Sequence, residues 1–357
     1  MKIVDCKIKL YDLPLARPIT IKGNTITRRK GAVLILRSEE RFVGYGEAAP
    51  LEGLHPESLD EVICQLSDLK SKIVGLDVGD GVFDFTGAFD ELLPKGLSGS
   101  VRLAVEMAMW DMYGQGKDAF AGMEKKNVLV NSLLVPGGGS IVSDAAKLVD
   151  AGYKSIKVKV GRGDVAKDIE MIRELKNAVE EKAALRLDAN RSWDIGQAVA
   201  FCREVGTDGI EYVEEPVGDI KDHGAFFEQT GLPIALDETL VECGCDIGND
   251  LSHVGAFILK PSLLGGFDRT AEFIRFAKEN GIKPVISCTF QSSLTLCSFA
   301  LFAAKMGLSD IAHGIGTFEW LGDDLLVDPV SVTNGSIKLA DVLKSRGSVR
   351  EDLLDLC

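Results

Sequence analysis

The chain has 357 residues, of which 46% are hydrophobic and 26% are charged, and its formal net charge at pH 7 is −14. This length accommodates a barrel with an appended domain, and the composition is ordinary for a globular protein. The negative charge and the lack of a basic stripe argue against a nucleic-acid-binding surface, and no run of about 18 apolar residues predicts a membrane span.

The first third of the chain has the pattern of strands followed by helices. Residues 2–13 and 31–47 alternate between apolar and polar side chains as strands do, and a tight polar turn divides the second range into two strands. Helical periodicity follows over about 56–74 and 98–116, where the second segment is apolar on more than one face. This order of elements indicates an α+β domain, which we assign to residues 1–125.

From Asn127 onward, short apolar segments alternate with helical or irregular ones. The expected strands cover residues 127–134, 154–160, 185–189, 210–215, 233–238, 256–261, 283–288 and 311–316. The segments between them cover about 140–151, 164–182, 194–206, 219–230, 244–252, 267–280 and 292–306, of which 244–252 is irregular. Eight nearly continuously apolar strands predict a closed parallel barrel of the α/β class, which we assign to residues 126–324.

The C-terminal segment, residues 325–357, returns to alternating strand character, with a turn expected at Asn334–Gly335. We expect this segment to rejoin the first domain, which would make that domain discontinuous. The pattern alone therefore predicts a barrel with an appended domain built from both ends of the chain.

Most cysteines, histidines and basic residues are expected to have structural or solvated positions. The eight cysteines show no CxxC or zinc-ligand spacing, so reduced cysteines are expected, including the close pair Cys243 and Cys245. The N-terminus predicts a strand rather than a signal peptide, and we expect a cytoplasmic protein. We expect residues 28–30 to be a solvated basic cluster, His55 to lie on the surface and His313 to line a site.

Charged side chains recur near the ends of successive apolar strands. At intervals of about one βα unit the chain has the pair Lys157 and Lys159, then Asp188, Glu214, Asp237 and Lys260. A charge at the end of a buried strand is costly unless it is paired or bound to a metal. Around a closed barrel these side chains meet in one cavity, which predicts a functional site.

Three carboxylates on adjacent strands, Asp188, Glu214 and Asp237, would form a set of hard oxygen donors with no histidine or cysteine among them. Such a set fits Mg²⁺, with Mn²⁺ as a substitute. Lys157 and Lys159 share one face of their strand. Because two close ammonium groups disfavour each other's charge, one of these lysines is a candidate general base.

Lys260 lies four strands further round a ring of eight, so we expect it to face Lys159 across the cavity. A cation that holds a substrate carboxylate between opposed lysines supports removal of the proton α to that carboxylate, through a stabilised enediolate. The alternative for each residue alone is structural, because a carboxylate after a strand commonly caps the next helix and a KxK strand commonly lies at a solvated edge. Their ordered recurrence favours the functional interpretation.

These motifs together resemble the enolase superfamily, and within it the muconate-lactonizing subgroup. The resemblance covers essentially the whole chain and rests on KVK at 157–159, DAN at 188–190, EEP at 214–216, DE at 237–238, and KP followed by Gly265 and Gly266. It implies a (β/α)7β modified TIM barrel with a discontinuous α+β capping domain. It also implies Mg²⁺ ligands at Asp188, Glu214 and Asp237, the base Lys159 with its neighbour Lys157, and the opposed Lys260. Strand alternation allows only one of Glu214 and Glu215 to face inward, and we assign Glu214 as the ligand.

Two further segments resemble the o-succinylbenzoate synthases of menaquinone biosynthesis. These are RLDANRSW at 186–193, where Arg186 shares the inward face with Asp188, and HGIGT at 313–317. The resemblance implies dehydration of a succinyl-bearing cyclohexadiene carboxylate to an aromatic product. Lys159 would remove the proton and return it to the departing hydroxide, while Lys260 stays a cation. Expected substrate contacts are Arg186, Asn190, Ser287, Gly314 and Gly316.

Related reactions remain open on the same residues. Epimerases of this subgroup usually carry an acidic DxD-type motif on the last strand, where this chain has Gly314, Gly316 and Thr317, which argues against dipeptide epimerization. N-acylamino acid racemization, which needs both lysines as bases, stays an alternative, as does a silent barrel that binds an acidic metabolite.

The expected partner is a small carboxylate, with no nucleic acid or membrane, and homo-oligomer formation is left open. Loops around 20–30 and 51–56 are expected to close over the substrate.

Overall fold

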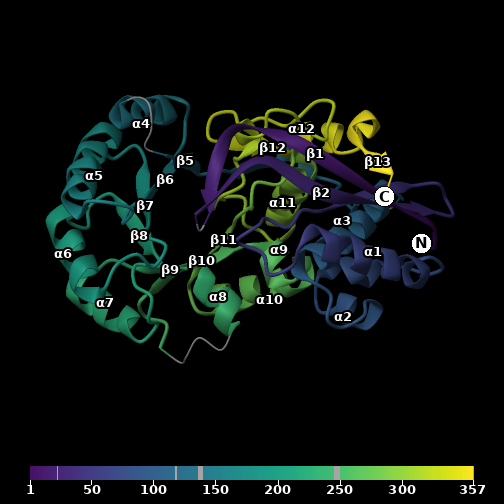
Figure 1. The fold of residues 1–357 in the computed structure, drawn as a ribbon, viewed down its shortest axis with the longest axis horizontal. Helices are drawn as coiled ribbons and strands as arrows, with labels where there is room; N and C mark the ends of the chain where they lie inside the picture. Colours follow the sequence, from purple (N-terminus) through teal and green to yellow (C-terminus); the bar gives the residue numbers. More distant parts are fainter. Residues whose placement is uncertain (22, 117–118, 136–139, 245–249, 357) are drawn as a thin grey trace.

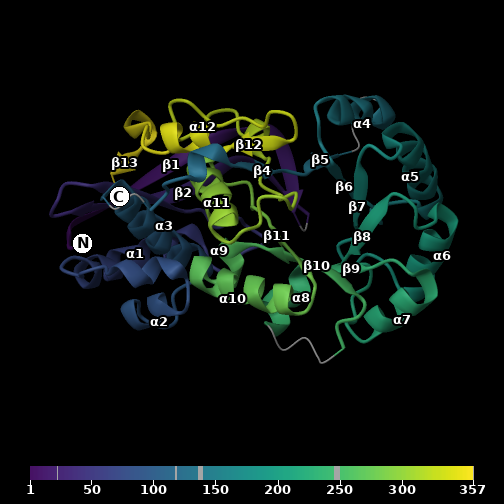
Figure 2. The same ribbon diagram turned by 180° about the vertical axis from the view of Figure 1, so that it is seen from behind.

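The computed structural model describes residues 1–21, 23–116, 119–135, 140–244 and 250–356. It consists of an antiparallel sheet with helices beside a curved parallel sheet whose helices lie on its outer face, and both chain ends lie on the antiparallel side (Figures 1 and 2). The predicted fold class, a modified TIM barrel with an α+β capping domain, is confirmed. No helix in the described ranges is long and apolar enough to cross a membrane.

The capping domain is built on a four-stranded antiparallel sheet in the order β13-β1-β2-β3. Its strands are β1 (Ile3–Ile21), β2 (Asn24–Ser38), β3 (Val43–Ala48) and β13 (Asp355–Leu356). Its helical segments are α1 (Leu59–Ile73), η1 (Asp80–Asp84), α2 (Ala88–Leu92), α3 (Gly99–Gly116) and η2 (Met123–Lys125). β1 and β2 pair as far as Ile21 and Asn24, so most of the stretch 20–30, expected to be a loop, is the distal part of a hairpin.

α3 is buried on nearly all sides because it packs between β3 and the barrel helices. Its close approach to β3 depends on two glycines of that strand. A Cβ at Gly46 would lie 1.8 Å from the carbonyl oxygen of Ala104, and one at Gly44 would lie 1.9 Å from that of Ala108. Glycine is therefore required at both positions, and the all-round apolar character of α3 follows from its central place.

The barrel sheet has seven parallel strands that neighbour one another in chain order. They are β5 (Ser132–Leu134), β6 (Ser155–Lys159), β7 (Ala184–Asp188), β8 (Ile210–Glu214), β9 (Ile234–Leu236), β10 (Val254–Leu259) and β11 (Lys283–Ile286). The helices that connect or follow them are α4 (Ile141–Asp150), α5 (Val165–Val179), α6 (Ile195–Val205), α7 (Asp222–Thr230), α8 (Glu238–Cys243), α9 (Pro261–Leu264), α10 (Gly266–Glu279) and α11 (Ser293–Lys305). α4 to α7 form an arc outside the first strands (Figure 1).

The eighth strand expected at 311–316 is not a regular strand. Instead, this segment closes the ring through isolated parallel bridges between His313 and Val130 on one side and Gly314 and Ser287 on the other. The amide of Gly314 donates to the Ile286 carbonyl at 2.8 Å, which continues the ladder of β11. His313 is fully buried, its Nδ1 accepts from the Ile286 amide at 3.0 Å, and it does not line the cavity, contrary to expectation.

Residues 127–134, expected to be one strand, change partners midway. β4 (Asn127–Leu129) pairs antiparallel with β12 (Ser336–Lys338), and only β5 joins the barrel sheet. The predicted turn at Asn334–Gly335 leads into β12, and both residues have positive φ angles, 52° and 64°. The remaining short elements are η3 (Phe318–Trp320), α12 (Leu339–Ser345) and η4 (Glu351–Leu353). The C-terminal segment thus pairs with β4 through β12 and with β1 through β13.

Arg29 joins the capping domain to the barrel, so its predicted place in a solvated cluster is wrong. Arg29 is 3% exposed, and its guanidinium donates to the carbonyl oxygens of Ala49, Pro50 and Phe290 at 2.7, 3.0 and 3.0 Å. A buried guanidinium needs this many acceptors to offset its desolvation. Six cysteines are free thiols in the described residues, whereas Cys245 and Cys357 lie outside them, as does most of the stretch expected to be irregular at 244–252.

Candidate active site

A cavity of about 550 Å³ lies between the C-terminal ends of the barrel strands and the tip of the β1–β2 hairpin. Most residues predicted from the sequence line it, namely Lys157, Lys159, Asp188, Asn190, Asp237, Lys260, Ser287, Gly314 and Gly316. Their meeting follows from the topology, because parallel strands in chain order bring all their carboxyl ends to one rim. Glu214 and Arg186 do not line the cavity and are buried behind its wall.

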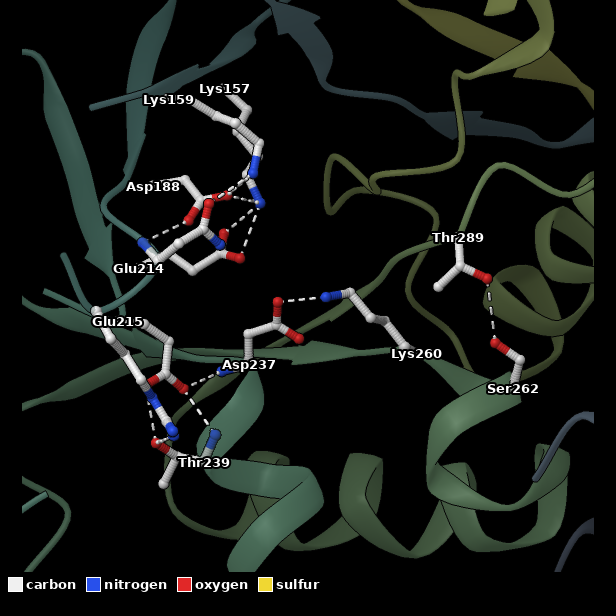
Figure 3. A network of polar contacts seen from close by, with 12 residues as sticks. Lys157, Lys159, Asp188, Glu214, Glu215, Asp237, Thr239, Lys260, Ser262 and Thr289 are labelled. Atoms are coloured by element: carbon white, nitrogen blue, oxygen red, sulfur yellow. Dashed lines mark hydrogen bonds and ion pairs between the residues drawn. The ribbon is translucent and has the colours of Figure 1, made fainter. Parts of the chain in front are cut away.

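Two lysines and two carboxylates form one cluster at the ends of β6, β7 and β8 (Figure 3). The strand register pairs Lys159 with Asp188, and Asp188 with Glu214. The Lys157 ammonium lies 2.9 Å from Asp188 Oδ2 and 2.6 Å from Glu214 Oε2, so it bridges the two carboxylates. Lys159 Nζ lies 3.2 Å from Asp188 Oδ2 and donates to Asn190 Oδ1 at 2.7 Å.

A second ion pair joins Asp237, which follows β9, to Lys260, which follows β10. Lys260 and Lys159 reach toward the carboxylates from opposite sides of the site (Figure 3). Both ammonium groups belong to largely buried side chains, 13% and 22% exposed respectively. The expected opposition of the two lysines is therefore present in the structure.

Glu214 and Glu215 turn to opposite sides, as strand alternation predicts. Glu215 has a φ of 43° and its carboxylate points away from the lysines. It accepts from the amides of Asp237 and Thr239, both at 2.8 Å, from the Thr239 hydroxyl at 2.9 Å, and from Arg191 Nε at 2.8 Å. Glu215 thus braces the strand ends that carry Glu214 and Asp237.

The two neighbouring lysines differ in their proton affinity. Burial lowers the pKa of Lys159, and the positive charges of Lys157 and Arg162 lower it further, against the attraction of Asp188. Burial also opposes the charge of Lys157, but Asp188 and Glu214 raise the pKa of that ammonium well above its ordinary value. One lysine of the pair is therefore suited to act as a base while the other stays a cation.

The three carboxylates fit a divalent cation by donor type and by charge. Asp188, Glu214 and Asp237 are 1–3% exposed, and burial together with the Asp188 charge raises the pKa of Glu214 to about 8. The raised pKa of Glu214 reflects burial and also repulsion between neighbouring carboxylates, which a bound cation would offset, and all-oxygen donors favour Mg²⁺. Within the described residues, no three His, Cys, Asp or Glu side chains are already arranged to hold a metal ion. The Lys157 and Lys260 ammonium groups contact the carboxylates of this site.

Arg186 is placed differently from the expected substrate contact. Its Nε donates to Glu211 Oε2 at 2.7 Å, and its Nη1 donates to the Ala312 carbonyl at 2.6 Å. Strand pairing sets Arg186 beside Lys157, one layer deeper in the barrel than Asp188. The side chain therefore ties the barrel strands together below the cavity.

Several cavity residues were not individually predicted from the sequence. Ile19, Thr20, Leu51, Leu54 and Trp320 come from separate segments of the capping hairpin, its following loop and η3. The prediction that the region around 51–56 covers the site agrees with the places of Leu51 and Leu54, although His55 is buried rather than on the surface. His55 Nδ1 accepts from the Leu51 amide at 3.0 Å, and Nε2 lies 3.1 Å from Ser262 Oγ.

Two other residues that line the cavity, Arg162 and Glu238, adjoin recognised motifs. Arg162 follows KVK at a distance of three residues from Lys159, and Glu238 is the second residue of DE. Their nearness in the chain to Lys159 and Asp237 was the available signal. One oxygen of Glu238 is buried without a partner among the described residues.

Residues 140–343 match the family model described as Enolase C-terminal domain-like. The chain is 30% identical to the chloroplastic protein PHYLLO of Arabidopsis thaliana, over 91% of this chain but only 21% of PHYLLO. It is 29% identical to o-succinylbenzoate synthase of Vibrio cholerae serotype O1, over 83% of this chain and 84% of that enzyme. It is 26% identical to L-Ala-D/L-Glu epimerase of Bacillus subtilis, over 85% and 86% of the two chains.

Solved structures resemble the chain over nearly its whole length. Muconate lactonizing enzyme from Pseudomonas fluorescens, complexed with muconolactone, has a TM-score of 0.82 at 21% identity, covering 99% of this chain and 98% of that one. An enolase superfamily member from Roseovarius nubinhibens, complexed with magnesium, has a TM-score of 0.79 at 21% identity, covering 99% and 97%. At these identities the likeness shows a shared fold.

Proposed function

Because the chain belongs to the Enolase C-terminal domain-like family, and so is an enzyme of the enolase superfamily, we propose that it is a Mg²⁺-dependent hydro-lyase. Its proposed substrate is a small carboxylate, 2-succinyl-6-hydroxy-2,4-cyclohexadiene-1-carboxylate, and its product is o-succinylbenzoate, an intermediate of menaquinone biosynthesis. The observation that carries the proposal is the opposition of Lys159 and Lys260 across buried carboxylates in one cavity (Figure 3).

In the proposed reaction Lys159 is the residue that moves the proton. Burial lowers the pKa of Lys159 and so raises the fraction of neutral amine, which removes the proton α to the ring carboxylate. The resulting ammonium then gives this proton to the hydroxyl group on the neighbouring carbon. The C–O bond breaks, water leaves, and the ring becomes aromatic.

Lys260 has the complementary role of a fixed cation. Burial opposes its charge, but Asp237 and Glu214 raise its pKa, so it stays protonated on the side of the cavity opposite to Lys159. A cation held there stabilises the negative charge that develops on the substrate carboxylate. Asp188, Glu214 and Asp237 would hold Mg²⁺, which supplies Lewis-acid stabilisation of the same charge when bound.

Two features support dehydration over amino-acid chemistry. Gly314 and Gly316 line the wall formed by the segment that closes the barrel, and residues 313–317 include no acidic side chain to hold a substrate ammonium group. Identity to o-succinylbenzoate synthase of Vibrio cholerae, at 29%, is also slightly higher than the 26% to the Bacillus subtilis epimerase.

The test is a spectrophotometric assay that follows formation of the aromatic product. We expect turnover of the cyclohexadiene substrate with Mg²⁺ and loss of turnover after chelation with EDTA, restored by added Mg²⁺ or Mn²⁺. An enzyme that binds Mg²⁺, as read by calorimetry, yet leaves this substrate unchanged would overturn the proposed reaction.

The second candidate is N-acylamino acid racemization. The opposed lysines favour it, since a racemase needs one base on each face of the α-carbon. We expect this activity, where present, to exchange the α-proton of N-acyl amino acids in D₂O and to depend on Lys260 as much as on Lys159. Exchange faster than dehydration would make racemization the main reaction.

A further inference from the structure

We propose that Arg162 binds a second anionic group of the substrate, remote from the carboxylate whose α-proton is removed. This inference rests on the proposed function and assigns the residue that selects dianionic substrates. Arg162 belongs to the cavity lining but to none of the clusters around Lys159 and Lys260.

The backbone on the N-terminal side of Arg162 is held in place. Gly161 has a φ of +75°, and a Cβ there would lie 1.8 Å from Ser192 Oγ, so only glycine fits. The Gly161 amide also donates to Asp168 Oδ2 at 2.7 Å, which ties the loop to α5. Arg162 therefore starts from a fixed position at the rim, next to the end of β6.

Of the described cationic side chains that line the cavity, Arg162 is the one without a counter-charge among the described residues. The other lining cations, Lys157, Lys159 and Lys260, each contact an aspartate or glutamate. Arg162 has no hydrogen bond or ion pair with any residue in the described part of the chain, and it is exposed. A free guanidinium offers five donors in a planar fork, the geometry that matches a carboxylate.

Among the described residues that line the cavity, no other cationic side chain lies outside the clusters around Lys159 and Lys260. The far wall of the cavity is the apolar cluster of Ile19, Leu51 and Trp320 with Leu54 and Phe290 packed against it. The arginine near that wall, Arg17, stacks on the Trp320 ring with its guanidinium carbon 3.6 Å from the ring centroid and does not line the cavity. A carboxylate remote from the reacting carbon would therefore meet its counter-charge at Arg162.

The experiment compares Arg162→Met with Arg203→Met, which removes an equal charge from an exposed arginine on α6 outside the cavity. Calorimetry with Mg²⁺ present measures binding of o-succinylbenzoate and of its analogue with the succinyl carboxylate replaced by a carboxamide. We expect Arg162→Met to weaken binding of the acid about 10- to 100-fold and to leave binding of the carboxamide unchanged. Arg203→Met should match the wild type on both, and Arg162→Lys should lie between.

Kinetics provide the second readout. Because the remote anion is bound alike in the ground and transition states, Arg162→Met should raise KM. The Arg162 charge also lowers the pKa of Lys159, so kcat is compared at alkaline pH, where Lys159 is neutral in both proteins, and should be nearly unchanged there. Equal binding of the acid by wild type and Arg162→Met overturns this inference, even where wild-type dehydration supports the proposed function. Conversely, an Arg162-dependent preference for the acid in an enzyme without dehydratase activity upholds the inference and overturns only the reaction.

Discussion

Buried carboxylates gather in two regions of the molecule, the joint between the capping domain and the barrel, and the floor of the cavity. At the joint Glu47 accepts from the Ser292 amide at 3.1 Å and from the hydroxyls of Ser292 and Thr295, both at 2.6 Å. At the cavity floor, Glu214 accepts from Lys157 Nζ at 2.6 and 2.8 Å. The donors to Glu47 are short and rigid, and the donor to Glu214 is the end of a flexible lysine stem.

This difference separates carboxylates that hold the fold from carboxylates that can exchange partners. A backbone amide or a hydroxyl on a packed helix cannot leave its acceptor without moving the chain. An ammonium group can withdraw by rotating its own side chain, which leaves the carboxylate free for a metal ion. Adjacent residues provide both cases, because Glu215 is held by backbone amides and a hydroxyl, whereas Glu214 is contacted by the Lys157 ammonium.

The largest effect is expected from removing the lysine with the lowered pKa. Lys159→Ala should reduce kcat/KM by at least about 10²–10⁴-fold, since the general base is lost. The fold should be retained, because Lys159 provides only one of the contacts to Asp188. Lys154→Ala, at an exposed position just before the same strand, is the matched control. Retained turnover in Lys159→Ala would contradict the base assignment.

The next prediction compares substitutions of the adjacent glutamates Glu214 and Glu215 by their effects on stability and on stabilisation by Mg²⁺. Glu215→Gln places an amide where four donors converge and should lower the free energy of unfolding by about 1–3 kcal/mol. Glu214→Gln should leave that free energy nearly unchanged in EDTA. It should abolish the stabilisation by Mg²⁺, which in the wild type reaches about 2.7 kcal/mol at one hundred times Kd.

Thermal unfolding with EDTA and with Mg²⁺ measures both effects. Two outcomes would contradict the separate roles of these glutamates. One is that Glu215→Gln loses the Mg²⁺ response and keeps its stability, and the other is that Glu214→Gln unfolds in EDTA as readily as Glu215→Gln does.

The contrast between these glutamates was predictable from the sequence, whereas the depth of a residue in the barrel was not. Alternation assigns a face, which placed Glu214 correctly and set Arg186 on the side of Asp188. It does not state how far below the rim a side chain lies. Arg186 is one register step deeper, where the Glu211 carboxylate and the Ala312 carbonyl occupy its donors.

The burial of side chains that contact distant segments also could not be predicted from the sequence. His55 and Arg29 look solvated in their local context, yet each is buried by partners from the barrel, Ser262 and Phe290 respectively. The segment at 311–316 looks like a strand, but isolated bridges on each side suffice to close the ring. Local patterns report local propensity, and packing decides the rest.

A smaller effect per pH unit is expected in the pH dependence of the joint. Burial raises the pKa of Glu106 from its ordinary 4.5 to about 7, against the attraction of Arg102. Between these pH values the folded chain keeps a proton that the unfolded chain has released. The contribution of Glu106 to stability is therefore fully present below pH 4.5 and is lost as pH rises toward 7, with a slope of at most about 1.4 kcal/mol per pH unit.

Glu106→Gln should remove this slope, while Glu174→Gln, at an exposed position on α5, should keep it. Urea unfolding at several pH values between 4.5 and 7 measures the difference. If the slope persists in Glu106→Gln, the pH dependence arises from other buried acids, such as Asp111, whose pKa burial raises to about 6.

The smallest effect should come from removing one of the several hydrogen bonds that Glu47 accepts. Tyr11 donates its hydroxyl to Glu47, and Tyr11→Phe removes this bond without changing the shape of the side chain. Because the Ser292 and Thr295 donors remain, Glu47 stays satisfied, and the free energy of unfolding should fall by only about 0.5–1.5 kcal/mol. The Mg²⁺-induced stabilisation should be unchanged, since Glu47 takes no part in the cavity. A loss above about 3 kcal/mol in urea unfolding would mean that these donors are not redundant, and that the joint is as dependent on single contacts as the cavity floor.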